Sequence, residues 1–358
     1  GMPDAELCGS IAWTMSSAPA DNANVLVDAN DGLARFTPHV AGDYVFSGTH
    51  PETGETLEET FTVVSSVGQA FHNYNYYPWH SVANVGDELW VANVYSPTIS
   101  RLSRVDLNTV GVIEVGEWPA SLAPVPGQEL VVVANKASDT LGFVDVREER
   151  QVDAVWVGDA PAGVVVSSDG ARAYVSLSGS NQVAVVDIAA RKLVKQIDAV
   201  FDPLALTLNE AGNELFVASH RSGQTNQYPY VSRDMEDEKD IAIIDTNTLE
   251  VTGYILEASS TINDLYFNAD SNELWMVATA NDIEGGLNDP DVYSFMHEVV
   301  VLEPEAGVAS RIRSADLTRQ ASSTGDAVTL QNMAVCNGEI WVTAESSDVT
   351  IALDPATL

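Results

Sequence analysis

The sequence is poor in basic residues and in long apolar runs, and each shortage removes a class of function. Its 16 lysines and arginines stand against 52 acidic residues, which gives a formal net charge of -36. A chain this acidic does not hold phosphate backbones or anionic lipid surfaces by electrostatic attraction. No run of about 18 apolar residues is present that could span a bilayer. We therefore expect no nucleic-acid partner and no transmembrane segment.

Cysteine is also scarce, with only Cys8 and Cys336, which lie nearly the whole chain apart. This number excludes a disulfide framework, and it leaves either one long-range bridge or two free thiols, of which the free thiols are favoured. A Cys-x-x-Cys-His sequence does not occur, so we expect no covalently attached c-type haem.

What the sequence does have is an internal repeat. An apolar strand that ends in small or polar residues recurs around six valines, at Val91, Val133, Val175, Val217, Val277 and Val342. The first four valines stand 42 residues apart (133 − 91, 175 − 133 and 217 − 175). A fixed spacing of this length is the signature of a repeat architecture, in which each copy forms one structural unit.

Further anchors divide each repeat into four short strands. An apolar residue followed by an acid closes the third strand, as at Val186-Asp187, and a proline such as Pro161 precedes the first strand. A four-stranded antiparallel unit of about 40 residues is typical of a propeller blade. The predicted fold class is therefore all-β: a β-propeller with six visible four-stranded repeats, in a six- or seven-bladed ring.

The strand Trp90-Val91-Ala92-Asn93 resembles the defining strand of the YVTN-type, surface-layer-like β-propellers of bacterial and archaeal exported proteins. The resemblance covers residues 67–358, which we assign to the propeller. It implies a propeller fold and a secreted, cell-surface or periplasmic location. It implies no set of catalytic residues, because members of the family differ widely in function.

Residues 1–66 carry no copy of the repeat anchors and form a separate predicted domain. Their segment 35–46 is similar to a corner and strand of the PKD-like, immunoglobulin-like domains of bacterial surface proteins. A full sandwich of that kind has about seven strands, whereas only four or five are visible here. We therefore expect a partial immunoglobulin-like β-sandwich before the propeller.

The sixth repeat lacks a fourth strand. Residues 60–67 come directly before the first repeat, so we expect them to pair with the strand near residues 349–353 and to close the ring. The alternative is a seven-bladed ring whose remaining repeat lies beyond Leu358.

Loop lengths predict where a ligand would bind. The distance from the repeat valine to the closing acid is 12 residues in the second repeat (145 − 133) but 28 in the fourth (245 − 217) and 26 in the fifth (303 − 277). These insertions leave on the face where the connections between repeats also lie, around the channel mouth. The first such connection, residues 71–80, is the densest aromatic run in the chain. The candidate ligand-binding residues at this mouth are His72, Tyr74, Tyr76, Trp79, His80, Trp118, His220, Arg221 and His297. The alternative interpretation is that the aromatic rings seal a joint and close the ring.

Metal sites are weakly indicated. Several histidines gather at the predicted mouth, but none forms a His-x-x-x-His pair. The insertion in the fifth repeat could offer oxygen ligands to Ca²⁺ through Asp282, Asp289 and Asp291, although it does not match an Asp-x-Asp-x-Asp-Gly loop. A solvated acidic loop is the favoured interpretation, and no other cofactor is expected.

Catalytic motifs such as Gly-x-Ser-x-Gly and Gly-rich phosphate loops do not occur, so an enzyme is not favoured. The leading hypothesis is an extracellular or periplasmic binding or adhesion module that recognises a protein, glycan or small ligand at the channel mouth. The alternative is the propeller component of a periplasmic redox or electron-transfer enzyme whose cofactor domain lies outside this chain.

Overall fold

The computed structural model describes residues 12–17, 42–49, 54, 56–63, 79–220, 239–259, 261–282, 294–317, 330–336, 339–344, 350–354 and 356. The chain divides into two compact units, Gly1–Tyr76 and Tyr77–Leu358. Among the described residues, no helix is long and apolar enough to cross a membrane. Cys336 is a free, exposed thiol, whereas Cys8 lies outside the described residues.

The first unit contains a three-stranded antiparallel sheet. Its strands are β1 (Ala12–Ser17), β2 (Gly42–Thr49) and β3 (Thr56–Val63), in the order β1-β2-β3. Tyr44 and Phe46 alternate along β2 and are buried, as expected for a sheet with one apolar face. The described strands are too few for a complete sandwich, so the immunoglobulin-like domain stays a prediction.

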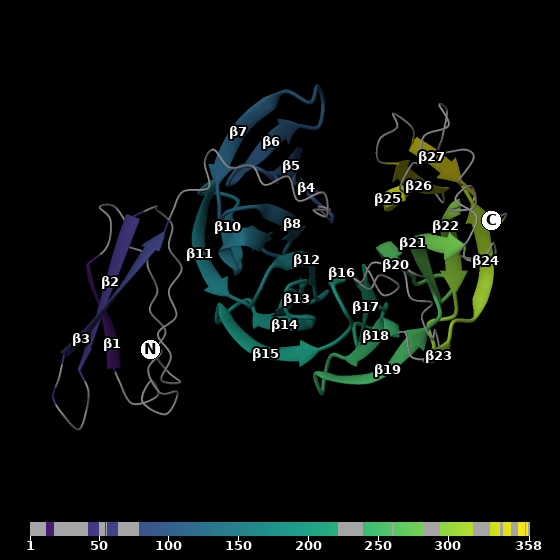
Figure 1. Cartoon of the computed structure of the whole chain (residues 1–358). Coiled ribbons are helices and arrows are strands. Elements are labelled where there is room, and N and C mark those ends of the chain that lie inside the picture. Colours follow the sequence, from purple (N-terminus) through teal and green to yellow (C-terminus); the bar gives the residue numbers. More distant parts are fainter. Residues whose placement is uncertain are drawn as a thin grey trace. The chain divides into compact units, whose positions relative to one another are not determined.

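The second unit is built from six sheets, which follow one another along the chain as the repeat predicts (Figure 1). Blade 1 comprises β4 (Val82–Val85), β5 (Glu88–Asn93), β6 (Thr98–Ser103) and β7 (Thr109–Glu114). Blade 2 comprises β8 (Pro119–Pro124), β9 (Leu130–Asn135), the 3-10 helix η1 (Lys136–Ser138), β10 (Thr140–Asp145) and β11 (Arg150–Trp156). Blade 3 comprises β12 (Pro161–Val166), β13 (Arg172–Leu177), β14 (Gln182–Asp187) and β15 (Lys192–Asp198).

The last three blades depart slightly from this pattern. Blade 4 comprises β16 (Pro203–Leu208), β17 (Glu214–Ser219), β18 (Lys239–Asp245) and β19 (Glu250–Leu256), with the short parallel β23 (Gly307–Val308) at its edge. Blade 5 comprises β20 (Thr261–Asn268), β21 (Glu273–Asp282), β22 (Ser294–Leu302) and β24 (Arg311–Asp316). Blade 6 comprises β25 (Leu330–Cys336), β26 (Glu339–Ala344) and β27 (Thr350–Leu353).

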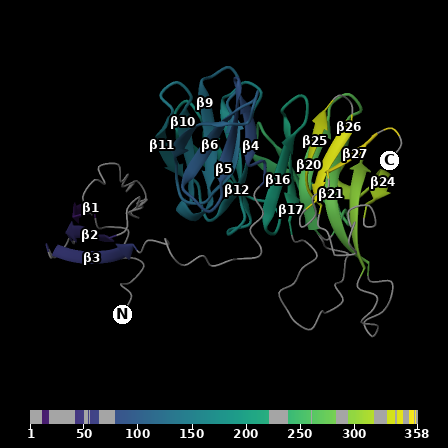
Figure 2. The same cartoon turned by 90° about the horizontal axis from the view of Figure 1, so that it is seen from above.

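The first strand of each blade lies innermost, and consecutive inner strands β4, β8, β12, β16, β20 and β25 pack against one another around an axis. In the turned view of Figure 2, the strands of the blades run roughly along one common direction. Aliphatic side chains of neighbouring blades form the cores between them, as in the cluster that joins blades 2 and 3. The prediction of an all-β propeller with six blades is confirmed.

The pairing register makes positions in the six blades comparable. Each repeat valine lies opposite one residue of the inner strand, and these partners are Val82, Leu122, Val164, Leu206, Asp264 and Met333. Five of the six partners are apolar. Asp264, in blade 5, is the exception.

The two end blades differ from the others in how well their faces are covered. Val82 is 52% exposed, whereas the equivalent residue of each other blade is at most 7% exposed. On blade 6, Trp341 is 40% exposed, although the equivalent residues Trp90, Val132, Tyr174, Phe216 and Trp275 are at most 2% exposed. Within the residues that the structure describes, the face of blade 1 that carries Val82 and the face of blade 6 that carries Trp341 are therefore not covered by another blade, as the corresponding faces of the inner blades are.

The expected ring closure by residues 60–67 is wrong for residues 60–63. These residues belong to β3, which pairs with β2 from Thr56↔Thr49 to Val63↔Gly42. Among the described strands, β27 pairs only with β26. Because β3 follows β2 after only a few residues, pairing these two strands closes a much shorter loop than pairing β3 with blade 6 would. Closing a short loop costs less chain entropy.

Two of the three equivalent tryptophans, Trp275 and Trp341, give a direct test of the exposed end face. Trp275→Ala should destabilise the propeller by about 3–5 kcal/mol, because it leaves a cavity in a packed core. Trp341→Ala should cost clearly less, since its side chain is already partly in solvent. Chemical unfolding monitored by circular dichroism measures both. Equal costs would show that the face of blade 6 is covered in solution.

Candidate functional site

The segment before blade 1 leads the chain onto the axis of the propeller. His80 adopts a left-handed backbone conformation (φ 48°), which turns the chain sharply after Trp79. The Ser81 carbonyl then accepts a hydrogen bond from the Ala92 amide (2.8 Å), so blade 1 begins immediately afterwards. The turn places two consecutive aromatic side chains among the inner strands.

Trp79 is packed among the inner strands of the propeller. Its side chain is completely buried and belongs to the same core as Leu204 and Leu206 of β16. On β12, Gly163 leaves room for the indole, because a Cβ there would lie 2.7 Å from Trp79 Cε3 and 2.5 Å from the Leu204 carbonyl oxygen. The indole is therefore packed against blades 3 and 4 from inside the channel.

The indole nitrogen has a charged partner in blade 5. Trp79 Nε1 donates a hydrogen bond of 2.7 Å to Asp264 Oδ1, which also accepts the Leu265 amide at 2.9 Å. The second carboxylate oxygen, Oδ2, accepts the Met333 amide of blade 6 at 2.8 Å. Asp264 is fully buried, and a buried carboxylate is tolerated only when donors surround it in this way.

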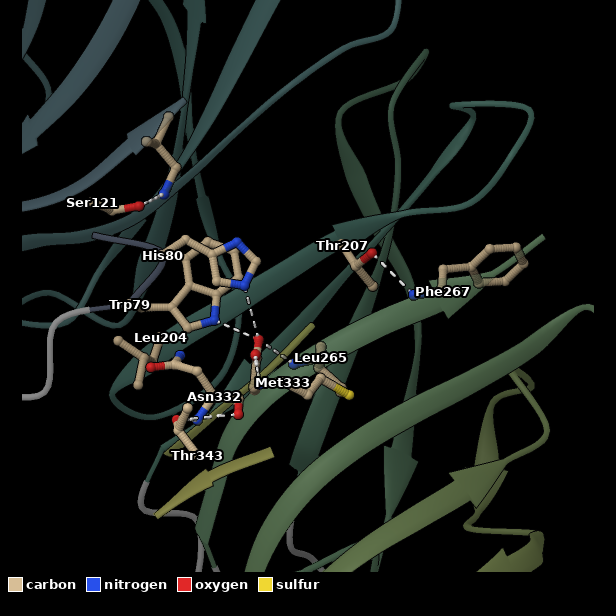
Figure 3. Close-up of polar contacts among 12 residues, drawn as sticks. Trp79, His80, Ser121, Leu204, Thr207, Leu265, Phe267, Asn332, Met333 and Thr343 are labelled. Carbon is tan, nitrogen blue, oxygen red and sulfur yellow. Dashed lines mark hydrogen bonds and ion pairs between the residues drawn. The ribbon is translucent and has the colours of Figure 1, made fainter. Parts of the chain in front are cut away.

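His80 completes the cluster and is its one exposed member. Its ring stacks on Trp79 with centroids 3.9 Å apart and planes 14° from parallel, and Nε2 lies 3.3 Å from Asp264 Oδ1. Figure 3 shows the two rings face to face, with contacts from both to the carboxylate between Leu265 and Met333. The His80 side chain is 44% exposed, so this imidazole reaches solvent beside the inner strands.

The protonation of His80 is set by opposing effects. Burial on its own lowers the pKa of His80, but the charge of Asp264 and the hydrogen bond with it outweigh burial and raise the pKa above 6.5. The cluster therefore favours an imidazolium that is held in place by a buried carboxylate.

The other described candidates lie at the same end of their blades but have partners of their own. Trp118 directly precedes β8 and is half-buried. His220 directly follows β17 and is buried, with Nδ1 3.6 Å from Asp202 Oδ2. His297 is buried in β22, where Nδ1 lies 3.1 Å from Thr279 Oγ1. Burial lowers the pKa of His297 despite the charge of Asp316.

The structure therefore brings together only Trp79 and His80 of the described candidates. Trp79 is buried. This burial fits the alternative interpretation of the aromatic run, in which its side chains seal a joint and close the propeller. Seven candidates lie outside what the structure describes, Asp282 by its side chain alone: His72, Tyr74, Tyr76, Arg221, Asp282, Asp289 and Asp291. In the described part of the chain, no group of three His, Cys, Asp or Glu side chains is arranged to hold a metal ion.

Three residues of this face were missed by sequence reasoning. Asp264 could have been found by aligning the repeats, since it is a charged residue at an apolar position. Tyr95, between β5 and β6, and Phe201, just before β16, are exposed aromatic residues on loops at the same end as His80. Both stand alone in their loops, so no local motif indicates them.

The sequence matches no protein-family model and no curated protein. Solved structures do match in fold. Hydrazine synthase of Kuenenia stuttgartiensis aligns with a TM-score of 0.61 at 20% identity over 76% of each chain. A functionally unknown protein from Desulfotomaculum acetoxidans DSM 771 aligns with a TM-score of 0.54 at 13% identity, over 87% of this chain and 92% of that one. A chain of a mitotic checkpoint complex aligns with a TM-score of 0.55 at 12% identity, over 88% and 85%. These likenesses show a propeller fold and no more, and the YVTN-type resemblance stays a prediction.

The close approach at Gly163 predicts a large effect from one methyl group. Gly163→Ala should destabilise the protein by about 1–3 kcal/mol, because the added Cβ overlaps both the Trp79 ring and the Leu204 carbonyl. Denaturant unfolding measures the cost. A neutral substitution would mean that Trp79 does not occupy the space above Gly163.

The raised pKa of His80 predicts a pH-dependent contribution to stability. A histidine whose pKa is raised on folding stabilises the native state fully below its unfolded pKa, and this stabilisation is lost as the pH rises through the folded value. His80→Gln should therefore destabilise the protein more at about pH 5.5 than at about pH 8.5. Unfolding curves of both proteins at the two pH values provide the test. An equal loss at both would contradict the Asp264–His80 interaction.

Proposed function

We propose that this chain is an exported binding module whose ligand, a protein segment, glycan or small molecule, binds at the channel mouth on His80. The observation that carries the proposal is the fixed, partly exposed imidazole of His80. Its ring is stacked on a buried indole and its Nε2 is held by a buried carboxylate, so its solvent-facing edge is presented in one orientation. Side chains held in this way lose little entropy on binding.

The surroundings of His80 suit recognition. Tyr95 and Phe201 are exposed on loops at the same end of the blades, and Trp118 is half-buried there. Aromatic residues provide rigid contact area with few rotatable bonds, which is why they are enriched in binding surfaces. Because Trp79 is completely buried, we expect the ligand to contact His80 rather than the indole.

The strongly negative charge of the chain sets limits on the ligand. A protonated His80 beside Asp264 is a locally neutral pair in a chain of net charge -36. Long-range attraction of an anionic partner is therefore weak, and short-range hydrogen bonding and stacking would supply the affinity. The alternative of a redox or electron-transfer component stays a prediction, because a fold likeness at 20% identity does not bear on activity.

Ligand-observed NMR with a defined panel tests the proposal. The panel contains neutral and acidic mono- and disaccharides and short peptides, each added to the whole chain. We expect at least one class to give saturation transfer that is lost in His80→Ala. The matched control is Val105→Ala, because Val105 is 95% exposed on the turn between β6 and β7, at the opposite end of blade 1.

The two variants separate the outcomes. Binding that disappears in His80→Ala and persists in Val105→Ala supports the site. Binding that persists in His80→Ala, or no binding by any member of the panel, contradicts the proposal that the ligand sits on His80.

A further inference from the structure

In the described part of the chain, blades 1 and 6 do not cover each other's end faces, so a different contact must hold these two blades in place. Between inner blades this is done by packing, because each blade buries the face of the next. The end faces lack that packing, since Val82 and Trp341 are both exposed where all equivalent residues are buried. Among the described strands, none joins blade 6 to blade 1 by main-chain pairing.

The contacts of residues 79 and 80 span the ring instead. On one side the chain continues directly into blade 1, where the Ser81 carbonyl accepts the Ala92 amide. On the other side Trp79 Nε1 binds Asp264 of blade 5, whose second oxygen binds the Met333 amide of blade 6. The His80 carbonyl accepts the Leu122 amide of blade 2 at 3.3 Å.

We infer that Trp79 and His80 form an axial strap, a two-residue segment that closes the propeller through its centre. The strap is held by its contacts with the Asp264 carboxylate. The strap connects blade 1 to blades 5 and 6 across the axis. It replaces the face-to-face packing that is missing between blades 1 and 6.

The choice of residue at position 264 supports this inference. An aliphatic residue occupies this position in blades 1 to 4 and methionine occupies it in blade 6, so packing alone does not require a carboxylate in blade 5. A buried carboxylate costs desolvation energy that a leucine would not. Here both of its oxygens are used, and they bind groups that come from two other parts of the ring, namely the strap and blade 6.

Hydrogen–deuterium exchange of the whole chain tests the strap, with Asp264→Leu as the main variant. This change gives blade 5 the residue type of its neighbours but removes the acceptor for Trp79, His80 and Met333. We expect amide exchange in β4–β5 and in β25–β26 to become about tenfold faster or more, because loss of a charge-assisted hydrogen bond shifts local opening by this factor. Exchange in β13–β14 of blade 3 should stay unchanged.

Two further variants keep the test decisive if Asp264→Leu folds poorly. Trp79→Phe retains an aromatic ring in the channel but lacks the indole N–H, so it should speed exchange in the same two blades. Asp198→Asn is the control, because Asp198 is an exposed acid on the outer strand β15 that accepts a hydrogen bond from Gln182. It should change exchange in neither blade.

The double variant provides the last comparison. Combining Trp79→Phe with Asp264→Leu should open the end blades little more than Asp264→Leu alone, because both remove the same contact. Faster exchange spread equally over all six blades, or none at the end blades, would overturn the inference. The first result would mean that Asp264 only stabilises the core, and the second that other contacts close the ring.

Discussion

One buried carboxylate at the axis determines how the centre of this protein is organised. Asp264 accepts hydrogen bonds from the Trp79 indole, from its own neighbour Leu265 and from Met333 of the next blade, and it lies against the His80 imidazole. A charge without these donors would be far too costly in a dry core. The position of the strap, the filling of the channel and the orientation of the exposed histidine therefore depend on the same group.

The arrangement also explains why the candidate site lies at the surface of the mouth. A propeller usually offers its central channel as a pocket, but here the indole occupies the level of Gly163 and Asp264. The His80 ring, which stacks on this indole, is the partly exposed member of the pair. The same two-residue segment thus performs a structural task with its buried side chain and presents a polar group with the exposed one.

Much of the fold could be predicted because it follows from a period. The repeat valines and the acids that close each third strand predicted six visible repeats and the order of strands within them, in a ring of six or seven blades. The six sheets of the second unit agree with the six repeats. The pairing of residues 60–63 could not be predicted in this way, because an alternating strand such as Thr56–Val63 fits an edge of either sheet. Its actual partner β2 is decided by proximity in the chain, which the repeat pattern does not contain.

The site was predicted only in part, for a related reason. The aromatic run indicated Trp79 and His80, yet their partner Asp264 is 185 residues away from Trp79, inside a strand that carries no binding motif. Long-range polar contacts of this kind depend on the strand register across several blades. In a single sequence, the only sign of such a contact is a residue whose type differs from that at the same position of the other repeats. Other candidates have partners close to their own blade, as His220 has in Asp202. For these residues the sequence indicated the end of the blade, but it did not indicate which side chains contact one another.

The organisation of the propeller centre depends most on the Trp79 indole being buried and hydrogen-bonded to Asp264. Hydrogen exchange of the seven tryptophan indole N–H groups, resolved by ¹⁵N NMR and assigned by single Trp→Phe substitutions, measures this directly. We predict that the Trp79 indole N–H exchanges only through large-scale opening, far more slowly than the indole N–H of the exposed Trp341. A Trp79 indole that exchanges as fast as that of Trp341 would contradict this prediction.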